Sequence, residues 1–180
     1  MACKMESQIC VTKHMKLVNM KLDTLSQLPD SLTDIEMNNV TIREGNLLKN
    51  CTQLNRLKCV DMTLGIFGNF LQLPDSLTDI EMYNVEIPLH AGSSLKNYTQ
   101  LNRLKCVDMA LGTLHTYLHL PDSLTDIEMY NVRIHGDSLL KNCRQLNKLR
   151  FVDMALGTLH TYLQLPDSLT DTEMYNVKVR

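Results

Sequence analysis

A thirteen-residue stretch occurs four times in this chain. It reads LPDSLTDIEMYNV at both 73–85 and 120–132, LPDSLTDIEMNNV at 28–40 and LPDSLTDTEMYNV at 165–177. The copies begin 45, 47 and 45 residues apart. Repetition at a nearly fixed interval of this length indicates a stack of similar units, in which each unit packs on its neighbours. The fold must therefore place the four copies in equivalent positions.

A second motif lies between the copies of the first. It reads LNRLKCVDMTLG at 54–65, LNRLKCVDMALG at 101–112 and LNKLRFVDMALG at 146–157. Both motifs fit one template, L-x-x-L-x-L-x-x-apolar-x-L, so each long interval contains two repeats with most matching positions 22 to 24 residues apart. This template and spacing resemble those of leucine-rich repeats, which are about 20–29 residues long. An irregular copy, with Thr12 in place of the first Leu, precedes the others.

Within each template, apolar and polar residues alternate over a short segment, as in Asp79, Ile80, Glu81, Met82 and Tyr83. This period of two predicts a half-buried strand. Strands joined by crossovers of about eighteen residues must run parallel. We therefore predict an α/β leucine-rich-repeat solenoid, a horseshoe or arc with about eight parallel strands on its concave face.

The crossovers are of two kinds. Segments such as 137–143, and its equivalents 46–51 and 93–98, predict short helices, with Asp137 or Ser138 as a candidate N-cap. The other crossovers contain Pro29, Pro74, Pro121 and Pro166, which favour an extended or turn connection. The convex face should thus alternate short helices with extended segments.

The chain should form a single domain, 1–180, with an irregular first repeat at 1–27 and paired units of about 46 residues over 28–180. No capping helix follows the last template. Since solenoids need terminal repeats with a polar outer face, we expect the chain to be a fragment of a larger protein. Self-association through uncapped ends is the other expectation.

Composition excludes several classes of partner. The chain is 44% hydrophobic and 21% charged, with a net charge of −2, so neither nucleic acid nor an acidic membrane surface is expected as a partner. It contains no apolar run of about eighteen residues, and charges interrupt its first seventeen residues. We therefore expect neither a membrane span nor a secretory signal, and predict a cytoplasmic protein.

The six cysteines do not suggest a disulfide framework. Cys59 and Cys106 occupy equivalent inward positions two strands apart, beyond the ~7 Å Cα separation that a bridge allows. Cys3 and Cys10 are the pair that could meet. Reduced, buried thiols in a cytosolic protein are the better interpretation.

No constellation for catalysis or cofactor binding emerges. His115 and His119 have a spacing that could bind a metal on a helix, but the next copy has Gln164 at the second position and Pro121 interrupts the helix. A structural or surface role for these histidines is favoured. We find no recurrent pairing of Ser or Cys with His and Asp, and no glycine-rich phosphate loop. We predict no enzyme activity, no metal and no cofactor.

The outward strand positions carry an ordered set of charges. Neighbouring parallel strands lie about 4.8 Å apart, so the central outward position forms a ladder of alternating sign, which contains Lys58, Glu81, Lys105, Glu128, Arg150 and Glu173. Opposite charges on neighbouring strands stabilise a sheet, and like charges destabilise it. The ladder is therefore either a self-neutralising surface or a pattern to which a partner must be complementary.

Two further outward positions form the candidate contact surface. The first carries a row of tyrosines beside valines, namely Tyr83, Tyr130 and Tyr175. The second is always Asp or Asn and includes Asp61, Asn84, Asp108, Asn131 and Asp153. Tyrosine offers a large amphipathic contact area at low entropic cost, although these rings could instead lie flat over valine and stabilise the sheet. The Asp carboxylates are about 9.6 Å apart, too far to share a metal ion.

The segment KNCTQLNRLK at 49–58 resembles helix-to-strand junctions in the repeat regions of NACHT-type innate immune receptors and F-box substrate adaptors. This resemblance implies an intracellular recognition or adaptor role. The predicted function is a noncatalytic scaffold that binds a protein partner of unknown identity on its concave sheet. The alternative is a structural or autoinhibitory spacer of a larger protein, with no specialised binding surface.

Overall fold

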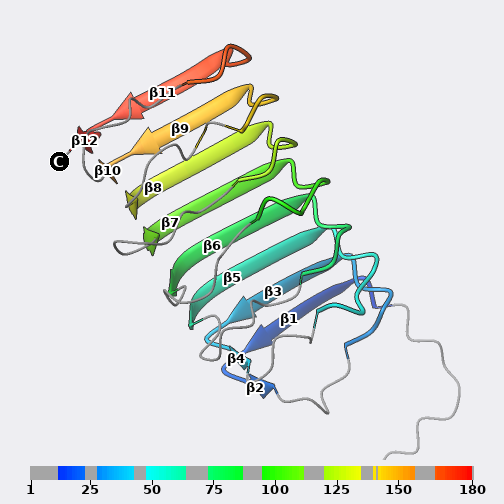
Figure 1. Ribbon diagram of the computed structural model, residues 1–180. Coiled ribbons are helices and arrows are strands. Elements are labelled where there is room, and N and C mark those ends of the chain that lie inside the picture. Colours follow the sequence, from blue (N-terminus) through cyan, green and yellow to red (C-terminus); the bar gives the residue numbers. More distant parts are fainter. Residues whose placement is uncertain are drawn as a thin grey trace, which may run out of the picture.

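The computed structural model describes residues 12–22, 28–42, 48–63, 73–86, 95–111, 120–134, 140, 142–156 and 165–179. These residues form a parallel β-solenoid, in which successive coils of the chain stack and each coil contributes a strand to one continuous sheet (Figure 1). The main strands are β1 (His14–Val18), β3 (Asp34–Asn38), β5 (Arg56–Thr63), β6 (Asp79–Glu86), β7 (Arg103–Leu111), β8 (Asp126–Ile134), β9 (Lys148–Val152) and β11 (Asp171–Tyr175).

Main strands that follow one another in the sequence are neighbours in the sheet. Every pair is parallel, and template positions align across the stack, as Ile80 does with Leu104 in β6 and β7. Short strands continue some coils: β2 (Lys21–Leu22) pairs with β4 (Thr41–Ile42), and β10 (Ala155–Leu156) lies between β8 and β12 (Lys178–Val179). Repetition of the template thus sets both the register and the order of the strands.

One residue in every coil has a left-handed backbone. It directly follows the outward Tyr, Val or Asn position, and its φ angle lies between 49° and 53° in all eight coils: Asn19, Asn39, Asp61, Asn84, Asp108, Asn131, Asp153 and Asn176. Asn and Asp are the non-glycine residues that enter this region most readily. The recurring Asp or Asn therefore has a structural cause, a bend in the chain at the same place in each coil.

The inward positions of the template form one continuous core. Leu77, Ile80 and Met82 in one coil and Leu101, Leu104 and Cys106 in the next are all buried. The described cysteines, Cys51, Cys59, Cys106 and Cys143, are buried and unpaired. Burial raises the pKa of the Cys59 and Cys106 thiols to about 12, so both are neutral at physiological pH. Cys3 and Cys10, with His115 and His119, lie outside the described residues.

The predicted helices, and with them the α/β horseshoe, are wrong for the part of the chain that the structure describes. Where helical segments were expected, the chain makes successive turns, in which the amides of Cys51, Tyr98 and Cys143 donate to the carbonyls of Leu48, Leu95 and Leu140 at 3.0 Å. A second turn follows at once, for example from Leu54 N to Cys51 O at 2.9 Å. The described residues hold no helix and thus none that could span a membrane.

The spacing of core residues explains the turns. Leu48, Cys51 and Leu54 are three residues apart and all buried, as are Leu140, Cys143 and Leu146 in another coil. Two consecutive four-residue turns that share their middle residue, Leu48 to Cys51 and Cys51 to Leu54, place every one of these side chains inward. A single helical turn, by contrast, fixes many dihedral angles for one hydrogen bond and is costly to nucleate. The remaining parts of the segments predicted to be helical lie outside the described residues.

The repeated LPDSLTD segment ties each coil to the preceding one. A turn begins at its proline, as in Leu77 N to Pro74 O at 3.3 Å. The serine hydroxyl then donates to a carbonyl of the preceding coil, as Ser123 Oγ does to Leu101 O at 2.7 Å. The threonine hydroxyl reaches another such carbonyl, from Thr125 Oγ1 to Asn102 O at 3.2 Å. These hydrogen bonds explain why the motif contains serine and threonine at positions that do not contribute to the core.

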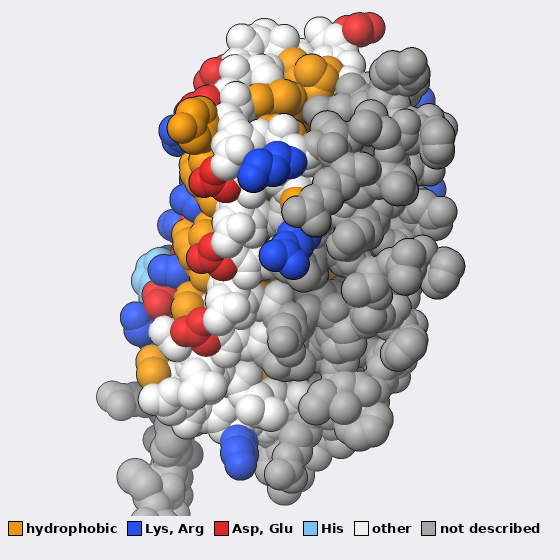
Figure 2. Space-filling view, turned by 90° about the vertical axis from the view of Figure 1, so that its left-hand side faces the viewer, with side chains coloured by type: hydrophobic (Ala, Val, Ile, Leu, Met, Phe, Trp, Pro, Cys, Tyr) orange, Lys and Arg blue, Asp and Glu red, His pale blue; other side chains and the backbone are white. Residues whose placement is uncertain are grey.

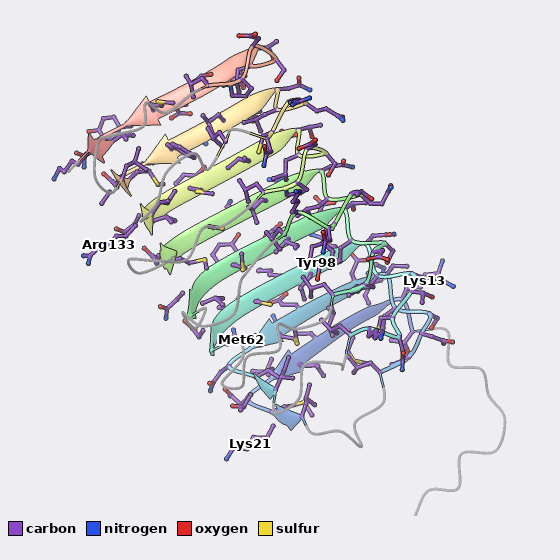
Figure 3. The ribbon with its side chains drawn as sticks, in the orientation of Figure 1. Lys13, Lys21, Met62, Tyr98 and Arg133 are labelled. Carbon is purple, nitrogen blue, oxygen red and sulfur yellow. The ribbon has the colours of Figure 1, made fainter. Side chains whose placement is uncertain are left out.

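Crossovers are also joined to each other. Tyr98 lies on a turn beside the strands (Figure 3), and its hydroxyl accepts a hydrogen bond from the amide of Leu73 at 3.4 Å. Burial raises the pKa of the Tyr98 hydroxyl, so it remains protonated. This side chain therefore fixes the spacing of two crossovers that are 25 residues apart in sequence.

Candidate protein-binding face

The outer face is defined here by the outward side chains at the first, third and fifth positions of the main strands. In β8 these are Asp126, Glu128 and Tyr130, each half-buried between buried neighbours. Seen from the side, basic, acidic and apolar side chains alternate along the length of the stack (Figure 2). No other strand of the described chain packs over this face, since the strands contact only their neighbours within a sheet.

The predicted charge ladder contains ion pairs between neighbouring strands. Lys16 Nζ lies 2.9 Å from Glu36 Oε1, Lys105 Nζ lies 3.4 Å from Glu128 Oε2, and Arg150 Nε lies 2.8 Å from Glu173 Oε2. Lys58 is 3.9 Å from Glu36. The ladder residues therefore lie together on one face, as the sequence predicts, and neutralise one another across the sheet.

Some of the pairing is diagonal. Arg56 stands in register with Asp79, yet its guanidinium binds Glu81 at 2.6 Å, and Arg103 binds Glu128 at 3.2 Å in the same way. A long arginine can reach the residue two positions along the neighbouring strand, which is within the range of diagonal pairs in a sheet. The two charge columns are thus linked into one network, a connection that separate columns in the sequence do not reveal.

Glu81 is the most enclosed charge of the described chain, with 7% of its surface exposed. Burial raises its pKa, but hydrogen bonds from Arg56 and from the Tyr83 hydroxyl outweigh burial and bring the pKa below its ordinary value. The equivalent Glu128 has a pKa lowered against burial by Lys105 and Arg103. Both carboxylates are therefore held ionised by their neighbours.

Two tyrosines of the predicted row lie between cations. Lys58 and Lys105 stand 5.5 and 6.0 Å from the centre of the Tyr83 ring, and Lys105 stands 5.4 Å from that of Tyr130. On the strand that follows, the Cζ atom of Arg150 lies 5.6 Å from the centre of the Tyr130 ring. Contacts of this length between a cation and an aromatic ring are stabilising. The hydroxyls also donate to glutamates of their own strands, from Tyr83 to Glu81 at 3.1 Å.

Tyr175 has a different environment from the other two. It lies on β11, which pairs with β9 alone among the described strands, and 68% of its surface is exposed. The three tyrosines thus share a face, and the structure brings Tyr83 and Tyr130 into the same pattern of contacts. Tyr175 stands at the open end of that row.

The Asp and Asn column is exposed beside the tyrosines and bonded within itself. Asn84 Nδ2 donates to Asp61 Oδ1 at 2.8 Å, and Asn131 bonds Asp108 over the same distance. Asp153 accepts from Asn176 at 2.6 Å. These residues also adopt the left-handed backbone conformation, a structural role that the contact hypothesis did not include. Its signal in the sequence was the restriction of one position to Asp and Asn in every repeat.

A shallow depression of about 390 Å³ lies on the outer face over β1, β3 and β5. Charged side chains of both signs line it, including Lys16, Asp34, Glu36, Arg56 and Lys58. Its acids are already in contact with neighbouring basic side chains, Glu36 with Lys16 and Asp34 with the His14 ring nitrogen at 3.0 Å. Within the described residues, no cluster of His, Cys, Asp and Glu could hold a metal ion.

Comparison of the chain with protein-family models and with curated proteins found no match. The repeat architecture therefore stands on the internal repetition of the sequence and on the stacked coils of the structure.

Proposed function

We propose that the chain is a noncatalytic scaffold that binds a protein partner on its outer face. The observation that carries this proposal is the row of Tyr83, Tyr130 and Tyr175, which runs along the sheet between charged side chains and over which no described strand packs. Tyr83 and Tyr130 are half-buried and held in place by their neighbours, so little side-chain entropy is lost when they act as contact anchors.

The network of ion pairs sets the chemistry of the partner. A complementary surface must offer acids opposite the basic strands and bases opposite the acidic strands, at intervals of about 4.8 Å. Such a pattern favours another regularly ordered polypeptide over a small molecule. We include in this proposal a cytoplasmic recognition or adaptor role, which the resemblance of segment 49–58 supports, and a relation to leucine-rich repeats, which the sequence template supports.

A structural spacer is the second candidate, and a specific observation favours it. The polar groups of the outer face are largely engaged within the chain: Glu81 with Arg56 and Tyr83, and Glu128 with Arg103 and Lys105. A surface that satisfies itself in this way needs no partner. The Tyr residues would then serve to cover the sheet.

Replacement of the three tyrosines separates the two candidates. We expect Tyr83→Ala, Tyr130→Ala and Tyr175→Ala together to weaken binding of a partner captured on the wild-type chain by about a hundredfold, since buried aromatic anchors dominate interface energies. The measurement is affinity for the purified partner, with thermal unfolding recorded in parallel.

The matched control replaces the same residues by Phe. It keeps the rings and removes the hydroxyls, so it should retain most of the binding. If the Ala variant loses thermal stability but binds as the wild type does, the row is structural and the spacer interpretation holds. Failure of the wild-type chain to retain any specific partner would also overturn the scaffold proposal.

A further inference from the structure

The two ends of the described sheet are open. Among the described strands, β1 pairs with β3 alone, and β11 pairs with β9 alone. Each therefore presents one edge of backbone amides and carbonyls that no described strand occupies. Such edges are templates for pairing with another chain.

Exposed apolar side chains gather at the same two ends. The large hydrophobic residues that are exposed in the described chain are Val18 and Met20 in the first coil and Leu165, Met174 and Tyr175 in the last. In the intervening coils the equivalent residues are buried or half-buried: Met129 is fully buried, whereas 40% of the surface of Met174 is exposed. Among the described residues, exposed large hydrophobic side chains are thus confined to the first and last coils, where a further coil would pack.

The two ends carry opposite charges. On β1 the outward residues are His14 and Lys16, and on β11 they are Asp171 and Glu173. Basic and acidic strands alternate through the whole stack, as in the pairing of Arg103 with Asp126 and of Lys105 with Glu128. Placing β1 after β11 continues this alternation. Placing two copies of β11 together would set like charges against each other, which is destabilising.

The contacts of the tyrosines point to the same junction. Tyr130 has a cation from the strand before it and another from the strand after it, Lys105 and Arg150. For Tyr175 no described strand follows β11. If β1 followed in register, Lys16 would take the place that Arg150 takes beside Tyr130, and Val18 would lie next to Tyr175.

We propose that β11 of one copy pairs, parallel and in register, with β1 of a second copy, so that the chain assembles head to tail. The contact buries Met174 and Tyr175 against Leu17 and Val18 and places Glu173 opposite Lys16. It joins two different surfaces, so the assembled pair still has one open end of each kind, and assembly continues into a filament unless the rotation closes a ring. This inference does not depend on binding at the outer face.

Cysteine cross-linking tests the register directly. With Cys3 and Cys10 replaced by Ser, one preparation carries Val18→Cys and another carries Tyr175→Cys. Neighbouring residues in register lie within the Cα distance that a disulfide allows, so the mixture should give a cross-linked dimer on a non-reducing gel. The matched control mixes Val18→Cys with Asp171→Cys, whose sites would be about 13 Å apart along the strand.

Sedimentation velocity tests the assembly itself on the 180-residue chain. The wild-type chain should increase in mass with concentration, and Met174→Lys should weaken this association by at least about tenfold, because it places a charge in the proposed contact. Asp75→Lys, on an exposed turn of a central coil, brings the same kind of charge and should change little.

Three outcomes would overturn the proposal. A wild-type chain that stays monomeric up to its solubility limit has ends that do not pair with a second copy. Tyr175→Cys that cross-links to itself as readily as to Val18→Cys indicates contact between like ends. Equal cross-linking in the in-register and control mixtures shows association without the proposed register. None of these outcomes bears on the outer-face scaffold, which substitutions at Tyr83 and Tyr130, away from the proposed junction, test separately.

Discussion

Strands β8 and β11 differ little in sequence and greatly in environment. Their motifs differ at one residue in thirteen, where Ile127 is replaced by Thr172. Yet the inward residues of β8, such as Ile127 and Met129, are buried, whereas every residue of β11 is exposed. The difference arises because β8 lies between two strands and β11 pairs with one among those described.

Burial in this protein is therefore a property of the stack. A single coil cannot enclose its own apolar side chains, and it depends on the coils before and after it. The same residue of the motif consequently contributes differently to the free energy of unfolding in the middle and at the end of the stack. Substitutions at equivalent positions in β8 and β11 measure that difference directly.

The largest effect should come from the core of β8. Ile127→Thr removes a buried methyl group and places a hydroxyl where Leu104 and Leu149 are its partners in register. The lost burial and the unsatisfied hydroxyl together should lower the free energy of unfolding by about 2–4 kcal/mol. The shift of the urea midpoint, with circular dichroism as the probe, measures it.

The reverse change at the other end is the matched control. Thr172→Ile restores the motif in an exposed strand, and it should change the free energy of unfolding by less than about 0.5 kcal/mol. Equal and opposite effects of the two substitutions would mean that β11 is as enclosed as β8. The comparison between the middle and the end of the stack would then be wrong.

Substitutions at the backbone bend should have similar effects in the middle and at the end of the stack, unlike substitutions in the core, because the bend is local. Asn131 and Asn176 both have φ angles near 50° and both donate to an Asp of the preceding coil. Replacement by Ala places a Cβ-bearing residue without a polar side chain in the left-handed region, at a cost of about 1–2 kcal/mol. We expect similar losses for Asn131→Ala and Asn176→Ala, measured by urea unfolding.

Glycine separates the backbone cost from the lost hydrogen bond. Asn131→Gly has no steric penalty at this φ angle, so it should be less destabilising than Asn131→Ala. If Ala and Gly were equally destabilising, the side-chain bond to Asp108 would be the main contribution instead. If Asn131→Ala lowered the free energy of unfolding and Asn176→Ala did not, the contribution of the bend would also depend on its position in the stack.

The sequence predicts those features that repeat in it. The parallel strands, their register and the shared face of Lys105, Glu128 and Tyr130 follow from alternation and from the spacing of the template. The ion pairs follow in sign, and Lys105–Glu128 and Arg150–Glu173 also follow in partner, but the partner of Glu81 does not follow. The column pattern gives Lys58 opposite Glu81, whereas the reach of the Arg56 side chain decides the observed diagonal contact.

The crossovers were mispredicted because their signal is short. Leu140, Cys143 and Leu146 fit the spacing of a helix face, and they also fit consecutive four-residue turns that share Cys143. Only the position of the following strand decides between the two, and that is a tertiary constraint. The bend at Asp108 and Asn131 was visible as a restriction to Asp and Asn, but exposure and a left-handed backbone restrict residue type in overlapping ways.

The smallest expected effect is that of acid on the paired glutamates. The folded-state pKa of Glu81 lies below its ordinary value of 4.5. Its stabilisation is therefore complete above the pKa of the unfolded chain and is lost as pH falls through the lower, folded-state pKa. Glu81→Gln should lower the free energy of unfolding at pH 7 by about 0.5–1 kcal/mol, since Arg56 keeps its access to water.

Repeating the urea titration at several pH values down to about 3 tests the sign. The wild type should approach Glu81→Gln in stability as the pH falls, because the protonated carboxyl resembles the amide in charge. Glu173→Gln at the end of the stack should be less destabilising at pH 7, because 53% of its side chain is exposed against 10% for Glu81. A constant gap between wild type and Glu81→Gln across this range would show that packing around the side chain, and not its charge, stabilises the middle of the stack.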